Sequence, residues 1–161
     1  MANDSPTSGA RVVTDSASSN VVPSAAHRLL TLITAAGLAV DAYVHWHLAP
    51  SFDTLTGAAS PHISQGQLFR LEAVLALAAM VLVLVSRSRL AAGFALLVAA
   101  GGVGAVLLYG YVDVGGLGPL PDMYDPAWST GKTVSAVAEA IAAVGALLLV
   151  LLPRGASEPD N

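Results

Sequence analysis

The chain has 161 residues, of which 55% are hydrophobic and 11% are charged, and its formal net charge is −4. Soluble domains carry about 25% charged residues, so this composition is typical of a membrane protein and excludes an ordinary soluble domain. The few, scattered basic residues exclude a nucleic-acid-binding surface. The absence of cysteine excludes disulfides, thiolate metal sites and thiol–disulfide chemistry within the chain.

The N-terminal segment, residues 1–26, is rich in Ser, Thr, Asn, Asp and small residues, and no apolar run begins before Leu29. A secretory signal would place its apolar core nearer to the start of the chain. We therefore expect a disordered cytoplasmic tail at 1–26 and, from similar composition, a second cytoplasmic tail at 154–161.

Residues 27–153 form the expected transmembrane domain. A membrane-spanning helix needs about 20 mostly apolar residues. The connections between the apolar stretches are rich in Pro and Gly or form a short polar turn. The sequence thus predicts an all-α fold, a bundle of four transmembrane helices with a structured loop between the third and fourth. The four predicted spans are 28–48, 67–85, 90–111 and 133–152.

The distribution of Lys and Arg predicts the orientation of the bundle, because cytoplasmic loops carry an excess of these residues. Only Arg70 and Lys132 fall on the side of the membrane where the second and fourth helices begin. The other basic residues fall on the opposite side, which predicts that both termini are cytoplasmic. These residues are Arg11, Arg28, Arg87, Arg89 and Arg154.

Three acidic residues lie inside the predicted spans: Asp41, Glu72 and Glu139. Counting 1.5 Å per residue from the outer end of each helix places them at similar depths, about 10 to 13 Å. Charged groups in a membrane usually face the bundle interior or water because exposure to lipid is costly. We therefore expect one layer of carboxylates in the outer half of the bundle.

Each acid has polar neighbours on its own helix face, where residues three, four or seven apart lie together. Asp41 shares a face with His45, and Glu139 shares one with Ser135 and Lys132, while Arg70 sits near the mouth. This pattern indicates a polar funnel that opens to the outside above an apolar inner half. His47 points away from His45, so these two imidazoles cannot chelate one ion on a regular helix.

The connection between the third and fourth spans carries acidic and aromatic residues among its prolines and glycines. This composition favours an ordered lid over the funnel, and the alternative is a plain interfacial loop. The residues expected in the lid are Asp113, Asp122, Tyr124, Asp125 and Trp128.

Three interpretations of the acidic layer remain open. In the first, Lys132 and Arg70 neutralise the acids in a purely structural network. In the second, the layer is a site for a proton, a quinone or a small polar ligand, because buried carboxylates beside a histidine can exchange protons. In the third, a divalent metal is bound, since imidazole and carboxylate suit zinc, iron or copper(II). The candidate metal ligands are Asp41, His45, Glu72 and Glu139.

Residues 28–152 resemble the DoxX-like group of small four-helix bacterial membrane proteins. The resemblance rests on Phe69-Arg70-Leu71-Glu72-Ala73 at the start of the second helix, the basic turn Arg87-Ser88-Arg89 and the small-residue run from Leu90 to Leu108. It implies an accessory component of a membrane redox or envelope-stress system, located in the bacterial inner (cytoplasmic) membrane. The cofactor stays open between a quinone and a divalent metal, and the sequence requires neither.

Two other functions stay open beside this one: a small transporter or metal-handling membrane protein, and a structural subunit of a larger membrane complex. No nucleophile, base and acid are spaced for catalysis, so the sequence does not favour an enzyme. The expected partners are membrane lipid and either another membrane subunit or a second copy of the chain.

Overall fold

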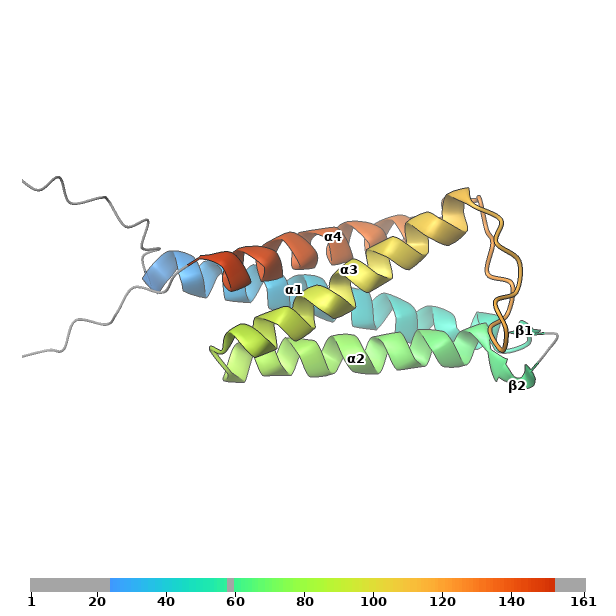
Figure 1. Ribbon diagram of the computed structural model, residues 1–161, viewed down its shortest axis with the longest axis horizontal. Helices are drawn as coiled ribbons and strands as arrows, with labels where there is room; N and C mark the ends of the chain where they lie inside the picture. The colour runs from blue at the N-terminus through green and yellow to red at the C-terminus, as the bar shows by residue number, and fades with distance from the viewer. Residues whose placement is uncertain (1–23, 58–59, 153–161) are drawn as a thin grey trace, which may run out of the picture.

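The computed structural model describes residues 24–57 and 60–152, and it shows four long helices (Figure 1). Each helix is long and apolar enough to cross a membrane, which indicates a multi-pass membrane protein and confirms the predicted all-helical class. Most of the expected N-terminal tail (1–26) and all of the expected C-terminal tail (154–161) lie outside the described residues. The helices are α1 (Ser24–Leu48), α2 (Gln65–Val85), α3 (Arg89–Tyr111) and α4 (Thr130–Leu151).

Three of the helices begin before their apolar runs because serine side chains cap them. Ser64, Ser88 and Ser129 each accept a hydrogen bond from the backbone N–H three residues later. In α2 the cap is reciprocal, since the Gln67 side chain accepts from the Ser64 backbone N–H at 3.0 Å. Such caps satisfy backbone donors that have no partner within the helix. Within the described residues, α1 already includes Ser24, four residues before the predicted start of the first span at 28.

The connection between α1 and α2 is more regular than its composition suggested. A 3-10 helix, η1 (Ala49–Phe52), continues directly from α1. Two short antiparallel strands follow, β1 (Thr56–Gly57) and β2 (Ser60–Ser64). The backbone N–H of Gln65 donates to the carbonyl of Leu55 at 2.8 Å and so ties this hairpin to the start of α2.

The bundle has small residues inside and large apolar residues outside. Alanines fill the buried faces of α2, α3 and α4, and Leu38 is the largest fully buried apolar side chain. Leucine and valine side chains such as Val74, Leu97 and Val144 are exposed on the outer surface. This arrangement suits lipid, which solvates large apolar side chains, while small residues allow the backbones to approach closely.

The closest helix contact joins α1 and α4. A Cβ atom placed on Gly37 would lie 2.7 Å from the carbonyl oxygen of Ala138 and 3.0 Å from the Cβ of Ala142. One turn away, Gly145 of α4 faces the side chain of Thr34. Glycine at 37 therefore allows the backbones of α1 and α4 to approach this closely.

The helices α2 and α3 meet at the turn that joins them and then diverge (Figure 1). At its far end α3 remains beside α4, while α2 remains beside α1. Residues 112–129, which we call the lid, run from the end of α3 towards the hairpin and back to α4. A Cβ on Gly57 of the hairpin would lie 2.8 Å from the carbonyl oxygen of Pro119, so lid and hairpin are in direct contact.

Candidate functional site

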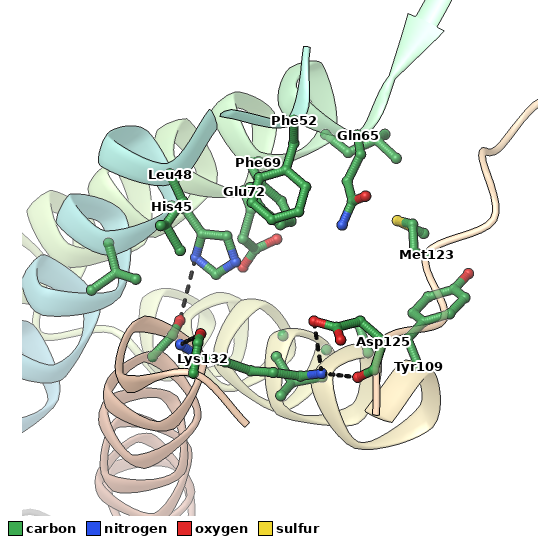
Figure 2. Close-up of a pocket in the computed structure, with 18 residues that line it drawn as sticks. His45, Leu48, Phe52, Gln65, Phe69, Glu72, Tyr109, Met123, Asp125 and Lys132 are labelled. Atoms are coloured by element: carbon green, nitrogen blue, oxygen red, sulfur yellow. Dashed lines mark hydrogen bonds and ion pairs between the residues drawn. The ribbon is translucent and has the colours of Figure 1, made fainter. Parts of the chain in front are cut away.

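A cavity of about 240 Å³ lies beneath the lid, between the diverging parts of α2 and α3. Apolar side chains from α1, η1, α2 and α3 form most of its wall, and Met123 of the lid contributes to its roof. Its polar lining side chains come from α1, α2, α3, the lid and α4, and Figure 2 shows several of them around the cavity. They include His45, Gln65, Glu72, Tyr109, Lys132 and Ser135.

His45 is positioned by Asp41, which lies one turn earlier on α1. Nδ1 of His45 lies 2.7 Å from Oδ1 of Asp41, and the Asp41 side chain is fully buried. Because Nδ1 faces Asp41, the other ring nitrogen, Nε2, faces the cavity on the side of Glu72 (Figure 2). A buried carboxylate that holds an imidazole in this way fixes the orientation of the ring.

Ser135 and Glu139 of α4 extend this arrangement across the bundle. The Ser135 hydroxyl donates to Oδ1 of Asp41 at 2.8 Å and lies 3.3 Å from Oε1 of Glu139. Glu139 is fully buried, and Gly102 of α3 makes room for its carboxyl group, since a Cβ on Gly102 would lie 2.6 Å from Oε1. Helical spacing pairs Asp41 with His45 and Glu139 with Ser135. The hydrogen bond from Ser135 to Asp41 joins these two pairs in the folded chain.

The three acids lie around His45, with Asp41 and Glu139 on one side of it and Glu72 on the other, but they do not all line one opening. Asp41 and Glu139 lie behind His45 and Ser135, outside the cavity lining, and only Glu72 lines the cavity. The cavity has polar side chains from several helices, and apolar and aromatic side chains make up the larger part of its wall. One oxygen of each acid is buried without a hydrogen-bond partner among the described residues: Asp41 Oδ2, Glu72 Oε1 and Glu139 Oε2.

The two cations expected to neutralise the acids are engaged elsewhere. Arg70 binds Asp53 through both ends of its guanidinium group, with Nη1–Oδ1 at 2.6 Å and Nη2–Oδ2 at 2.8 Å. This pair fastens the segment after η1 to α2. Within residues 24–57 and 60–152, neither Arg70 nor Lys132 forms an ion pair with Asp41, Glu72 or Glu139. The interpretation in which these cations neutralise the acids therefore fails.

The hydrogen bonds from Arg70 hold the pKa of Asp53 below its ordinary value of 3.8. A carboxyl group with a lowered pKa stabilises the fold above the ordinary value and loses that contribution as the pH falls through its own pKa. We expect a carbon-13 NMR titration to give an Asp53 midpoint below 3.8, and Arg70→Gln to return it towards 3.8. The control Arg87→Gln, at the other end of the bundle, should leave it unchanged, and a native midpoint at or above 3.8 would contradict this assignment.

Lys132 fastens the lid and does not reach Glu139. Its Nζ donates to the backbone carbonyls of Asp125 and Ala127, lies 3.7 Å from the Asp125 carboxylate and sits 5.5 Å from the centre of the Trp128 ring. The backbone N–H of Asp125 also donates to the carbonyl of Tyr109 at 3.0 Å. The lid is thus tied to the ends of both α3 and α4.

Aspartates give the lid its local order. The side chains of Asp113, Asp122 and Asp125 each accept a hydrogen bond from the backbone N–H two residues later, at 3.0 to 3.1 Å. These Asx turns hold the backbone without a helix or strand. Tyr124 and Trp128 are exposed at the surface of the lid. The Trp128 ring packs against the ring of Tyr111, with the ring centres 6.0 Å apart.

The side chains of the site permit binding and proton exchange more readily than nucleophilic chemistry. Ser135, His45 and Asp41 are the residue types of a hydrolase triad, but the Ser135 hydroxyl lies on the Nδ1 side of the ring, 3.5 Å away, together with Asp41. A triad needs the serine on Nε2.

One oxygen or nitrogen from each of Asp41, His45 and Glu139 lies within 4.8 Å of the others, which is a spacing that a metal ion could bridge.

Several cavity residues had no functional signal in the sequence. Phe52 and Phe69 pack with their ring centres 4.9 Å apart, and Phe69 also meets the edge of His45 at 5.2 Å. Gly102 belongs to the small-residue run from Leu90 to Leu108, in which nothing distinguishes it from the other small residues. His47, in contrast, is exposed while His45 is buried, as the helical spacing predicted, and its ring stacks on Tyr43.

No protein-family model, curated protein or solved structure matches the chain.

Proposed function

We propose that this protein binds a small ligand with a polar end and an apolar ring body, of the quinone class, as an accessory component of a membrane redox system. One observation carries the proposal: a largely apolar cavity at membrane depth contains an oriented imidazole, His45, and a carboxylate, Glu72, that share one wall. Ligand sites are typically apolar pockets with a few placed polar groups. The similarity in layout to DoxX-like proteins supports the same role.

The chemistry of the polar end fits a ring oxygen. His45 can give or take a proton at Nε2, while Asp41 holds the ring from behind. Glu72 has a buried oxygen without a protein partner among the described residues, so a donor group on the ligand would satisfy it. The aromatic rings of Phe52, Phe69 and Tyr109 offer flat surfaces to a ring body.

The proposed setting is the inner membrane of a bacterial cell, with both termini in the cytoplasm. The basic residues Arg28, Arg87 and Arg89 lie at the end of the bundle where α2 joins α3, and Arg70 and Lys132 lie towards the lid end. The excess of positive charge on cytoplasmic segments supports this orientation. The lid would then face the outside.

Binding of a short naphthoquinone, menadione, to the full chain in lipid nanodiscs tests the proposal. We expect saturable menadione binding that weakens about tenfold or more in His45→Gln, which removes a placed donor. Binding of the reduced form, menadiol, should weaken likewise in Glu72→Gln, because only the quinol has a hydroxyl that can donate to the Glu72 carboxylate. The matched control is His47→Gln, two residues along α1 and exposed, which should bind as the native chain does. Circular dichroism confirms that each variant is folded.

Glu72→Gln tests the ligand site more directly than His45→Gln does. One Glu72 oxygen has no hydrogen-bond partner among the described residues, so the substitution breaks no protein contact at that atom. Absence of saturable menadione binding to the native chain would refute the proposal. Equal binding by Glu72→Gln, His45→Gln and His47→Gln would place the ligand elsewhere and would also refute it.

A metal-handling role is the second candidate, and the spacing of Asp41, His45 and Glu139 favours it. Carboxylates and an imidazole suit zinc, iron or copper(II). Stoichiometric metal in protein purified from native membranes, lost in Asp41→Asn and Glu139→Gln but retained in Glu72→Gln, would favour this role over quinone binding.

A further inference from the structure

We infer that the ligand of this cavity comes from the hydrocarbon phase of the bilayer and enters sideways, between α2 and α3. The inference rests on the proposed function and specifies its substrate class: a lipid-dissolved ring compound, as opposed to an aqueous ion or solute. Three features support it: the closure of the lid end, the open side of the cavity and the depth of that opening.

The lid end of the cavity is closed by ordered contacts. Met123, Asp125 and Ser129 contribute to the cavity wall from above. Lys132 binds two lid carbonyls, the Asp125 backbone N–H binds Tyr109, and the far side of the lid rests on Gly57 of the hairpin. A solute arriving from water would have to displace these contacts.

The side of the cavity between α2 and α3 is open and built from very small residues. Gly101 and Ala105 line the cavity and are at the same time exposed on the outer surface of the bundle. A Cβ on Gly101 would meet no atom within 4 Å, so no side chain stands in front of the opening there. On the α2 side, Leu68 and Glu72 face the same cavity from a helix that diverges from α3 (Figure 1).

The opening lies at hydrocarbon depth. Gly101 is near the midpoint of α3 (Arg89–Tyr111), which is long and apolar enough to span a membrane. The neighbouring exposed residues on α3 are apolar, including Leu97, Leu107 and Leu108. A molecule at this opening is therefore surrounded by lipid tails, and only a hydrocarbon-soluble compound reaches it at useful concentration.

The path leads directly to the polar end of the site. Gly102, on the next position of α3, lines the cavity and contacts Glu139, and the cavity wall then continues to His45 and Ser135. A flat ring that passes Gly101 and Ala105 therefore presents its oxygen to His45, and in the quinol form its hydroxyl can donate to Glu72, while its apolar edge or tail remains in the bilayer.

Two probes with the same ring test the route in nanodiscs: menadione, which partitions into lipid, and 1,4-naphthoquinone-2-sulfonate, which stays in water. We expect the native chain to bind menadione and to bind the sulfonate at least about tenfold more weakly. Ala105→Phe should slow menadione association about tenfold by narrowing the opening. The matched control is Ala100→Phe, an exposed alanine on the opposite face of α3, which should associate at the native rate.

The outcomes separate the route from the proposed function. Slow association in Ala105→Phe alone, with weak sulfonate binding, supports lateral entry. Sulfonate binding as tight as that of menadione, or native association rates in Ala105→Phe, would overturn lateral entry while ligand binding stands. Absence of binding of either probe to the native chain would overturn both.

Discussion

Replacing Asp41 by alanine should lower the free energy of unfolding by about 3 kcal/mol, the cost typical of removing one partner from a buried charged pair. Asp41 is fully buried, and its Oδ1 accepts from Ser135 and contacts Nδ1 of His45. Without it, both groups would remain buried with their main partner gone. Reversible unfolding of the purified protein in mixed micelles, followed by circular dichroism, measures the change.

Two variants make this measurement specific. Asp41→Asn keeps an oxygen that can accept both hydrogen bonds, so it should cost clearly less than Asp41→Ala. Asp53→Ala removes an aspartate from an exposed ion pair and should have little effect, because exposed pairs contribute little to stability. If Asp41→Ala were as stable as Asp53→Ala, the buried network would not hold the bundle together.

The second large effect is expected at the contact between α1 and α4. Gly37→Ala places a Cβ against the Ala138 carbonyl oxygen, a backbone atom that cannot rotate away. Overpacking of this kind costs about 1 to 3 kcal/mol. We expect a corresponding loss of stability in the same unfolding assay, together with loosening of the attachment between the two helices.

The matched control is Gly104→Ala in α3, where a Cβ would meet no atom within 4 Å. Alanine is the better helix former, by about 0.5 to 1 kcal/mol, so this variant should be equal to the native chain or slightly more stable. The same Gly→Ala substitution thus lowers the free energy of unfolding at Gly37 and leaves it unchanged or raises it at Gly104. Equal effects at both positions would show that α1 and α4 do not approach as closely as described.

The helices could be predicted from the sequence because their signal is local. Each apolar run is longer than a bilayer requires, and the Pro and Gly residues mark the connections. The helices end at Leu48, Val85, Tyr111 and Leu151, and the spans predicted from apolar runs end at about 48, 85, 111 and 152. The starts were predicted late because the caps at Ser64 and Ser129 lie in polar sequence, before any apolar pattern begins.

The site was only partly predictable, because its decisive contacts join distant helices. Spacing on one helix correctly paired Asp41 with His45 and Glu139 with Ser135. Depth counting gave each acid its level along the helix but not its direction, and so it could not separate Glu72 in the cavity from Asp41 and Glu139 behind it. The partners of Arg70 and Lys132 depend on the paths of the hairpin and the lid, which no periodicity encodes.

The alanine-rich half of the bundle, on the other side of Asp41 and Glu139 from the lid, has a bioenergetic consequence. Within the described residues, Thr34 is the only polar side chain buried there, and its hydroxyl has no partner. A proton needs a chain of polar groups or water to move across a membrane. If the site binds a quinone, as we propose, the described side chains therefore offer a proton no continuous polar row between His45 and the end of the bundle where α2 joins α3.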